Sequence, residues 1–301
     1  MKILITGGSG YLGKNLFNYL KKKKTKFKTF SIPRSIDLTL EKKVNNYFMK
    51  SGKLNYIFHF AEVSGNKAWS KKNSFQQTLM NLRININIIS AWKKYQPNAK
   101  FIFVSSVWSY PLGDPFLKEK DYWKGELNPE TIHFAYNKRI ATILLESAKN
   151  NFKLKATTLI LGTVYGPGDL SDHFIPTIIR RMKKEKETLQ VYGTGLESRD
   201  FIYIDDQIKG IFMHKDQNEE IINIGTGKLT SVKSFAEKCF NYLGLDYSKY
   251  VVVDKKLIRP SKTSFLKANV KKAKKNFNYE IKTNIDQLIK IMMDSELDKY
   301  K

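Results

Sequence analysis

The chain has 301 residues, which suits one large domain or two closely joined ones with a sizeable buried core. Its residues are 42% hydrophobic and 13% aromatic, which excludes a disordered protein, and the single cysteine, Cys239, excludes an internal disulfide. The formal charge of +25 arises from lysines in scattered runs, such as residues 21–24 and 271–275, which are typical of a solvated surface, so we expect no nucleic-acid partner.

The chain begins with a short apolar strand at residues 2–6, which leads through a glycine-rich turn into an amphipathic helix at residues 11–20. In such a turn the first glycine permits a tight bend, the second lets a pyrophosphate approach the backbone, and the third lets the helix pack on the strand. The motif alone can be a simple turn, but its place between strand and helix favours dinucleotide binding, with the phosphates at the helix N–H groups. The residues predicted to contact the cofactor here are Gly7, Gly10, Tyr11, Leu12 and Gly13.

The second expected strand, at residues 27–31, leads into the sequence SIPRS and lacks the Asp or Glu that binds a free 2′-hydroxyl of the adenine ribose. Ser31 and Arg34 offer a hydroxyl and a guanidinium, and the planar guanidinium fork suits a 2′-phosphate. We therefore expect NADP(H) in preference to NAD(H). The alternative interpretation is that Arg34 is an ordinary surface arginine.

Further motifs follow in order along the chain. They are DLT at 37–39, IFHFAEVSG at 57–65, Asn81, FVSSVWSYP at 103–111, VYGPGD at 164–169, VYGTGLESRDFIYIDD at 191–206 and NIGTG at 223–227. Together with the glycine turn they resemble the extended short-chain dehydrogenase/reductase family, in particular its nucleotide-sugar reductases and epimerases, such as GDP-fucose synthases and GDP-4-keto-6-deoxy-sugar reductases. The resemblance covers nearly the whole chain.

This resemblance implies an α/β fold, a Rossmann-type doubly wound parallel sheet with a smaller α+β substrate domain. Residues 1–165 would form the NAD(P)-binding domain, residues 200–222 would return to it, and residues 166–301 would form the nucleotide-sugar-binding domain. The helices near 77–95 and 134–150 match those that pair two subunits in relatives. A homodimer is therefore expected from the resemblance.

The resemblance also implies which residues line the cofactor. Many relatives have two alanines where this chain has Ala61 and Glu62. The Glu62 carboxylate therefore either lies near the cofactor or substrate or turns to solvent, and both interpretations are open. Asp37 and Leu38 would lie by the adenine ring. The other residues implied here are Phe60, Asn81 and Ser105 for the cofactor and Val63 for the substrate.

Hydride transfer at a sugar carbon requires a group that moves a proton on the sugar oxygen, and the family uses a Tyr assisted by a Lys and a Ser or Thr. A free Tyr titrates near ~10, so neighbouring positive charge must lower its pKa before it acts near neutrality. Lys138 matches the lysine, which also holds the cofactor ribose in this family. Ser106, four residues before Tyr110, matches the serine better than Ser105 does. At the tyrosine position, one helical turn before Lys138 and on the same face, stands Phe134.

Three explanations of Phe134 are open: an engineered change that traps bound substrate, a natural variant whose proton comes from another group, and a binding protein without catalysis. The other catalytic and cofactor positions match the family, which favours the first. On that explanation Phe134→Tyr would raise turnover ~10²- to 10⁴-fold, the usual contribution of general acid–base catalysis. Tyr136 is no straightforward substitute, because a spacing of two residues from Phe134 places it on another side of the helix.

His173 stands where fucose-synthase relatives carry a histidine that is used in epimerisation together with a cysteine shortly after the serine. Val107 and Trp108 stand in the place of that cysteine, and neither can move a proton. A bifunctional epimerase-reductase is therefore not expected. A role in capping or packing the following helix is the alternative for His173.

The second half of the chain would bind the nucleotide sugar. Arg199, in SRDFIYIDD, corresponds to the family arginine that binds the diphosphate, and its planar group suits paired bonds to phosphate oxygens. Amphipathic helices are expected at 230–243 and 285–293. The other residues predicted at the substrate site are Trp108, Thr163, His173, Arg180, Lys184 and Arg259.

The leading hypothesis is an NAD(P)-dependent oxidoreductase acting at C4 of a GDP-linked, CDP-linked or dTDP-linked 4-keto-deoxyhexose or heptose. A nucleotide-sugar 4-epimerase of the same fold and a non-catalytic NADP(H)-binding protein are the alternatives. A dehydratase is not favoured, because Ser-Val-Trp at 106–108 replaces the Thr-Asp-Glu usual in that group.

No apolar run approaches the ~18 residues of a membrane span and no Cys/His cluster has metal-ligand spacing, so we expect a cytoplasmic protein with neither membrane contact nor a metal site.

Overall fold

The protein is seen in a computed structural model that describes residues 1–23, 27–65, 67–169, 189–191, 195–217, 220–253 and 265–297. Its centre is a six-stranded sheet in the order β11-β6-β4-β3-β1-β2, in which every neighbouring pair of strands runs parallel. The strands of this sheet are β1 (Lys2–Thr6), β2 (Lys28–Ser31), β3 (Tyr56–His59), β4 (Lys100–Ser106), β6 (Ala156–Leu161) and β11 (Ile221–Ile224).

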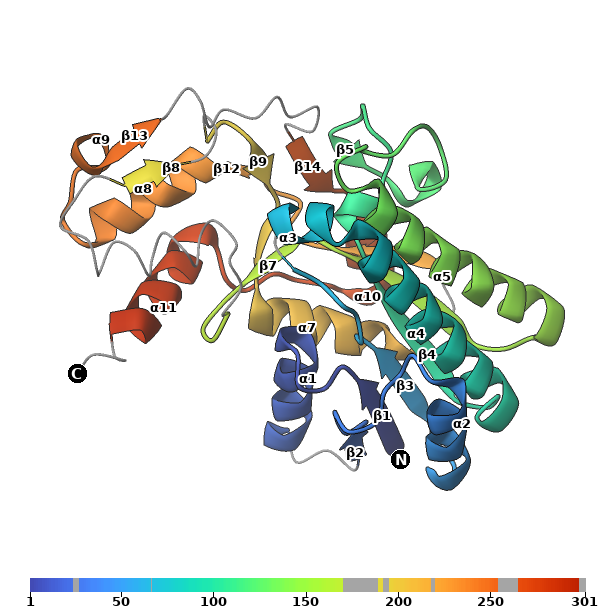
Figure 1. Ribbon diagram of the computed structural model, residues 1–301. Coiled ribbons are helices and arrows are strands. Elements are labelled where there is room, and N and C mark those ends of the chain that lie inside the picture. The colour runs from blue at the N-terminus through green and yellow to red at the C-terminus, as the bar shows by residue number, and fades with distance from the viewer. Residues whose placement is uncertain are drawn as a thin grey trace.

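Helices cover both faces of this sheet (Figure 1). They are α1 (Tyr11–Lys22), α2 (Glu41–Lys50), α4 (Ser74–Tyr95), α5 (Ile132–Phe152) and α7 (Ile204–Met213). Successive side chains of a strand point to opposite faces, so Leu4 packs in the cluster with α2, α4 and α5, while Ile3 and Ile5 pack in the cluster with α1 and α7. A parallel sheet buried by helices on both faces is a doubly wound α/β fold, and the predicted fold class is confirmed.

Smaller sheets lie above the main sheet in Figure 1. Strand β7 (Thr163–Tyr165) pairs with β10 (Phe201–Tyr203), and β8 (Leu189–Val191) pairs with β13 (Val251–Val253). A four-stranded sheet in the order β12-β9-β14-β5 joins segments that are far apart in the sequence. Its strands are β5 (Phe116–Leu117), β9 (Ser198–Arg199), β12 (Thr230–Ser231) and β14 (Phe265–Ala268).

The remaining helices belong mostly to the second half of the chain. They are α3 (Lys67–Lys72), α8 (Val232–Tyr242), α9 (Tyr247–Tyr250), α10 (Lys271–Phe277) and α11 (Ile285–Leu297), with 3-10 turns η1 (Val107–Ser109), η2 (Glu119–Asp121) and η3 (His214–Asp216). Helices α8 and α11 share a hydrophobic cluster with Tyr165 and Phe201. None of the helices within the described ranges is both long and apolar enough to cross a bilayer.

The chain returns to the main sheet after the smaller sheets have begun. Strand β11 pairs with β6 at the sheet edge, with Ile221 opposite Thr158, and α7 packs in the same hydrophobic cluster as α1. The limits of the two domains stay a prediction.

One helix begins later than expected. Thr230 and Ser231 pair with β9, and the Ser231 Oγ accepts a hydrogen bond from the Ser234 N–H at 3.0 Å, so Ser231 is the N-cap of α8. The predicted helix at 230–243 therefore starts at Val232.

Candidate active site

The glycine turn joins β1 to α1 and leaves no room for a side chain at Gly7 or Gly13. Gly7 has φ +69°, and a Cβ on Gly7 would lie 2.7 Å from the Ala61 backbone nitrogen. A Cβ on Gly13 would lie 2.3 Å from the Gly7 carbonyl oxygen, which accepts a hydrogen bond from the Gly10 N–H at 2.9 Å. Gly10, the N-cap of α1, has no side chain to cap the helix. The turn thus fits a dinucleotide, whose pyrophosphate would bind the N–H groups of the first turn.

Tyr11 and Leu12, predicted beside the cofactor, have side chains that pack into the core. Both lie at the edge of the hydrophobic cluster that contains α1 and α7. A Cβ on Gly166 would lie 2.8 Å from the Tyr11 hydroxyl, and burial raises the pKa of that hydroxyl. We therefore expect Leu12 to contact a cofactor through its backbone, because its side chain packs into the core.

The end of β2 is tied to the glycine turn. The Arg34 Nε donates a hydrogen bond to the Ser9 Oγ at 2.8 Å, and Gly8 packs directly against Ser31, whose Oγ would lie 2.0 Å from a Cβ on Gly8. Arg34 is exposed, so its guanidinium is accessible to a ligand phosphate.

The segment after β2 is an ordered turn. The Asp37 carboxylate accepts hydrogen bonds from the Thr39 N–H at 2.9 Å and the Thr39 hydroxyl at 2.7 Å, and these bonds lower the pKa of Asp37. The Leu38 carbonyl accepts a hydrogen bond from the Asn87 Nδ2 at 3.0 Å. The Asp37 carboxylate therefore holds the turn, and a contact of this segment with adenine stays a prediction.

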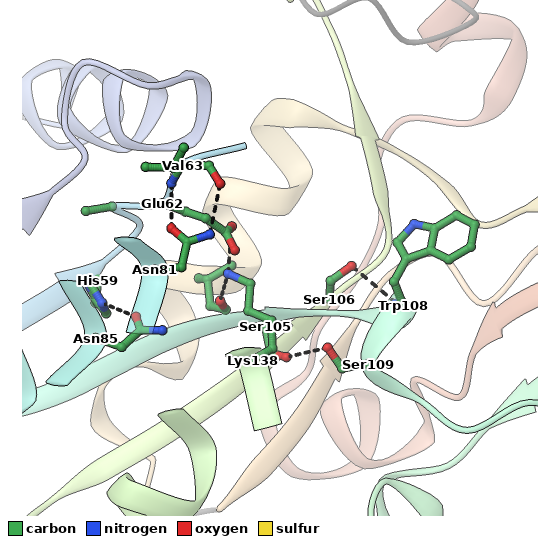
Figure 2. A network of polar contacts seen from close by, with 12 residues as sticks. His59, Glu62, Val63, Asn81, Asn85, Ser105, Ser106, Trp108, Ser109 and Lys138 are labelled. Carbon is green, nitrogen blue, oxygen red and sulfur yellow. Dashed lines mark hydrogen bonds and ion pairs between the residues drawn. The ribbon is translucent and has the colours of Figure 1, made fainter. Parts of the chain in front are cut away.

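Asn81 holds the loop that follows β3 (Figure 2). Its Nδ2 donates to the Val63 carbonyl at 2.9 Å and its Oδ1 accepts from the Val63 N–H at 2.8 Å, while the Gln77 Nε2 also donates to the Val63 carbonyl at 3.1 Å. These bonds fix the backbone beside Phe60 and Ala61, which pack at the edges of the two main clusters.

His59, at the end of β3, is a polar core residue that the sequence did not single out. One ring nitrogen lies 2.6 Å from the Thr6 hydroxyl and the other 2.9 Å from the Asn85 Oδ1. Burial lowers the pKa of His59 to about 4. Both nitrogens are engaged, so His59 is a neutral structural residue near neutral pH.

Lys138 and Glu62 form an ion pair. The Lys138 Nζ lies 2.8 Å from the Glu62 Oε2 and donates a hydrogen bond to the Val104 carbonyl at 3.0 Å, near the end of β4. Figure 2 shows the two side chains pointing toward each other. The Lys138 side chain is 9% exposed and that of Glu62 is 20% exposed. The Glu62 carboxylate thus meets the predicted catalytic lysine.

Phe134 lies where the helical spacing predicts. The Lys138 Nζ lies 5.6 Å from the centre of the Phe134 ring and 5.2 Å from that of Phe103. Tyr136, two residues further on, is 50% exposed and faces another side of α5. The ammonium group is therefore bordered by two aromatic rings without hydroxyls.

Ser105 and Ser106 differ in their surroundings. The buried Ser105 hydroxyl lies 3.2 Å from the Tyr122 hydroxyl and 3.3 Å from the Ser109 hydroxyl. Ser106 is partly exposed, and its Oγ accepts a hydrogen bond from the Trp108 N–H at 3.3 Å (Figure 2). The Ser106 hydroxyl is the one that a ligand can reach.

Arg199, on β9, lies against Trp108. Its guanidinium carbon is 5.1 Å from the centre of the Trp108 ring, and its Nη1 donates to the Ser198 carbonyl at 2.9 Å. Burial lowers the pKa of the Arg199 guanidinium. Thr163 lies on the short strand β7, which pairs with β10. The predicted residues His173, Arg180, Lys184 and Arg259 lie outside the described residues.

Asp200 is a further residue that sequence reasoning missed. Its carboxylate accepts hydrogen bonds from the Thr226 N–H at 2.7 Å and the Gly227 N–H at 2.8 Å. It thereby fixes the NIGTG turn next to Arg199. The aspartate after the arginine in SRD was the available signal.

A cavity of about 470 Å³ opens elsewhere, between α2 and the β1–β2 edge. Its lining includes Phe30, Ile36, Lys43, Tyr47 and Leu54. None of the predicted site residues lines this cavity, and the chemistry is better placed at the ends of β1, β3 and β4.

These features define a Rossmann-type dinucleotide-binding protein with a lysine and a serine near the end of its fourth strand. The chain belongs to the NAD dependent epimerase/dehydratase family, whose family model matches residues 3–225, and the resemblance inferred from the motifs is confirmed. It is 30% identical over 277 residues to the GDP-L-colitose synthase of Yersinia pseudotuberculosis, covering 86% of this chain and 89% of that protein.

Two solved structures share the fold. The UDP-glucose 4-epimerase of Thermotoga maritima, crystallised with UDP-glucose, has a TM-score of 0.86 and 21% identity over the whole of both chains. The GDP-D-glycero-L-gluco-heptose synthase of Campylobacter jejuni, determined in the presence of NADPH, has a TM-score of 0.82 and 23% identity, covering 99% of this chain and 98% of that one.

Proposed function

We propose that this protein is an NAD(P)-dependent oxidoreductase that acts at C4 of a nucleotide-linked 4-keto-deoxyhexose or heptose, with GDP as the favoured nucleotide and CDP or dTDP as the others. The observation that carries the proposal is the hydrogen bond of 3.0 Å from the Lys138 Nζ to the Val104 carbonyl, two residues before the partly exposed Ser106 at the end of the same strand. Ligands of open α/β sheets bind at the carboxyl ends of the strands, where both groups lie. The GDP-L-colitose synthase relative supports the choice of a GDP-linked sugar.

Each group of residues has its own role in the proposed reaction. The glycine turn binds the pyrophosphate, and Arg34 with Ser31 binds a 2′-phosphate, so NADP(H) is favoured over NAD(H). A nicotinamide cofactor, when bound, supplies or accepts the hydride. The Ser106 hydroxyl bonds the reacting sugar oxygen, and Arg199, stacked on Trp108, binds the diphosphate. The predicted parts of His173, Arg180, Lys184 and Arg259 remain proposals.

The test is a substrate panel. The purified chain is mixed with GDP-, CDP-, dTDP- and UDP-linked 4-keto sugars and with NADPH or NADH, and absorbance of the reduced nicotinamide is followed. We expect oxidation of NADPH with one keto sugar, faster than with NADH. Interconversion of sugars without use of added cofactor would instead indicate the 4-epimerase. Failure to bind either cofactor or any nucleotide sugar by calorimetry would refute the proposed function.

A further inference from the structure

Two departures from the family pattern meet at one lysine. Phe134 lacks the tyrosine hydroxyl, and its ring centre lies 5.6 Å from the Lys138 Nζ. Glu62 stands where many relatives have alanine, and its carboxylate lies 2.8 Å from the same nitrogen. We propose that Glu62 and Lys138 form a proton couple that performs the acid–base step for which the Phe134 ring has no hydroxyl. This inference rests on the proposed oxidoreductase function.

Three other groups at this end of the sheet that could exchange a proton are already engaged. Both ring nitrogens of His59 are hydrogen-bonded, to Thr6 and to Asn85. The Tyr110 hydroxyl donates to the Asn223 Oδ1 at 2.8 Å, and the buried Tyr122 hydroxyl lies 3.2 Å from that of Ser105. Lys138 and Glu62, by contrast, form an ion pair whose Lys138 Nζ lies 5.6 Å from the centre of the Phe134 ring, and we assign the proton step to this pair.

The geometry leaves Lys138 a donor for the substrate. An ammonium has three N–H donors. In the described part of the chain, Glu62 and the Val104 carbonyl use two of them. The hydrogen bond to the Val104 carbonyl fixes the nitrogen near the end of β4, so the third donor is available to a substrate oxygen bound at this end of the strand. Lys138 is thus the residue that meets the reacting oxygen, and Glu62 acts through Lys138 by returning a proton to it.

The proton step balances for reduction of a ketone. As the hydride forms the new C–H bond at the carbonyl carbon, the C–O π pair moves to the oxygen. That oxygen takes a proton from the Lys138 ammonium, so an O–H bond forms and an N–H bond breaks. The resulting amine is reprotonated from water through the Glu62 carboxylate, which first binds the proton and then passes it across the hydrogen bond. Oxidation of the alcohol runs through the same steps in reverse.

Burial supports this order of transfer. Glu62 is 20% exposed and Lys138 only 9%, so the carboxylate is the member of the pair nearer to solvent. Water therefore exchanges protons with Glu62, while Lys138 faces the drier site. Among the three explanations of Phe134, this arrangement favours the natural variant, because an engineered change at residue 134 would not account for Glu62.

The test compares Glu62→Gln in two backgrounds, the parent chain and the Phe134→Tyr variant, with the keto sugar that the panel identifies. In the parent, loss of the couple should lower kcat ~10²-fold or more, the scale of acid–base catalysis. In the Phe134→Tyr background the tyrosine hydroxyl serves the oxygen, so Glu62→Gln should cost less than ~5-fold, a non-additivity that marks a shared role. Glu237→Gln, which breaks an exposed pair with Lys233 (3.7 Å), is the matched control and should leave kcat unchanged.

A second measurement does not depend on turnover. The free chain is treated with an amine-acylating N-hydroxysuccinimide ester, and labelled peptides are quantified by mass spectrometry. Glu62→Gln should increase the acylation of Lys138, because the ion pair no longer engages the ammonium. Glu237→Gln should leave the extent of Lys138 acylation the same as in the parent.

Three results would overturn the proposal. One is equal loss of kcat from Glu62→Gln in both backgrounds, which would make the glutamate purely structural. Another is unchanged acylation of Lys138 in Glu62→Gln. The third is that the parent chain binds NADPH but has no turnover, while the Phe134→Tyr variant is active. This result would overturn the proton couple but would not contradict the proposed oxidoreductase function. Absence of cofactor and nucleotide-sugar binding in both chains would instead end the proposed function itself.

Discussion

Ser105 and Ser106 are neighbours in the chain, but their hydroxyls have different surroundings. We predict that Ser106→Ala lowers kcat ~10²-fold with little change in stability, because this hydroxyl is accessible to the sugar oxygen. Ser105→Ala should chiefly lower stability, by about 1–3 kcal/mol, because it leaves the buried Tyr122 hydroxyl without that partner. Steady-state kinetics and urea unfolding of both variants separate the two effects. The reverse pattern would make Ser105 the catalytic serine.

His59 gives the protein a pH-dependent stability. Burial lowers its pKa to about 4 in the folded chain, whereas an unfolded histidine titrates near ~6.5. The unfolded chain therefore binds one more proton than the folded chain between these pH values, so the stability from this group is present above pH ~6.5 and is lost as the pH falls toward 4. The limiting slope is about 1.4 kcal/mol per pH unit for one proton.

The measurement is the free energy of unfolding in urea between pH 4 and 7 for the parent and His59→Gln. The carboxylates and other histidines are common to both proteins, so the difference in slope isolates His59. We expect a shallower slope in the variant. Parallel curves would show that His59 is protonated alike in the folded and unfolded chains.

At the scale of elements, the junction of β1 and α1 depends on backbone contact. Gly7 and Gly244 both have φ +69°, but a Cβ on Gly244 meets nothing within 4 Å, whereas one on Gly7 lies 2.7 Å from the Ala61 nitrogen. Gly244→Ala should therefore cost only the left-handed conformation, about 1–2 kcal/mol. Gly7→Ala should lower the melting temperature further and abolish NADPH binding. Calorimetry checks both, and equal effects of the two substitutions would contradict the close packing.

Local features were predictable from the sequence because they depend on neighbours along the chain. The strand, turn and helix at the N-terminus follow from glycine spacing and periodicity, and the structure has β1 and α1 there. The helical period likewise placed Phe134 one turn from Lys138, as the 5.6 Å separation shows. The prediction of a helix at 230–243 was wrong at its first residues, because Thr230 pairs with β9 and this pairing overrides the local helical pattern.

Contacts between segments that are distant in the sequence could not be predicted in the same way. Whether Glu62 faced solvent or the site depended on how the loop after β3 packs against α5, and that packing brings its carboxylate to Lys138. The amide of Asn81 holds Val63 through two hydrogen bonds, and its expected role at the cofactor stays a prediction. His59 is buried only because β3 lies between β1 and β4. Each of these needs the assembled sheet.

At the scale of the whole molecule, α5 and α4 carry large apolar side chains that stay exposed by more than a third in the described chain. On α5 these residues are Ile132, Tyr136, Ile140 and Ile143, whose spacings of four, four and three place them on one helix face. On α4 they include Phe75, 78% exposed, and Ile86. Exposed apolar patches of this kind mark interaction sites. We predict that two copies of the chain pair through these helices.

Light scattering after size exclusion tests this pairing. The parent should have the mass of a dimer at micromolar concentration, because burying this face removes apolar surface from water at roughly 25 cal/mol per Å². Ile140→Glu together with Ile143→Glu should yield a monomer that keeps its fold, since both residues are at the surface of α5. Met49→Glu, on the exposed end of α2, is the control and should remain dimeric. A monomeric parent would contradict the prediction, and a dimer that survives the double substitution would place the interface on another face.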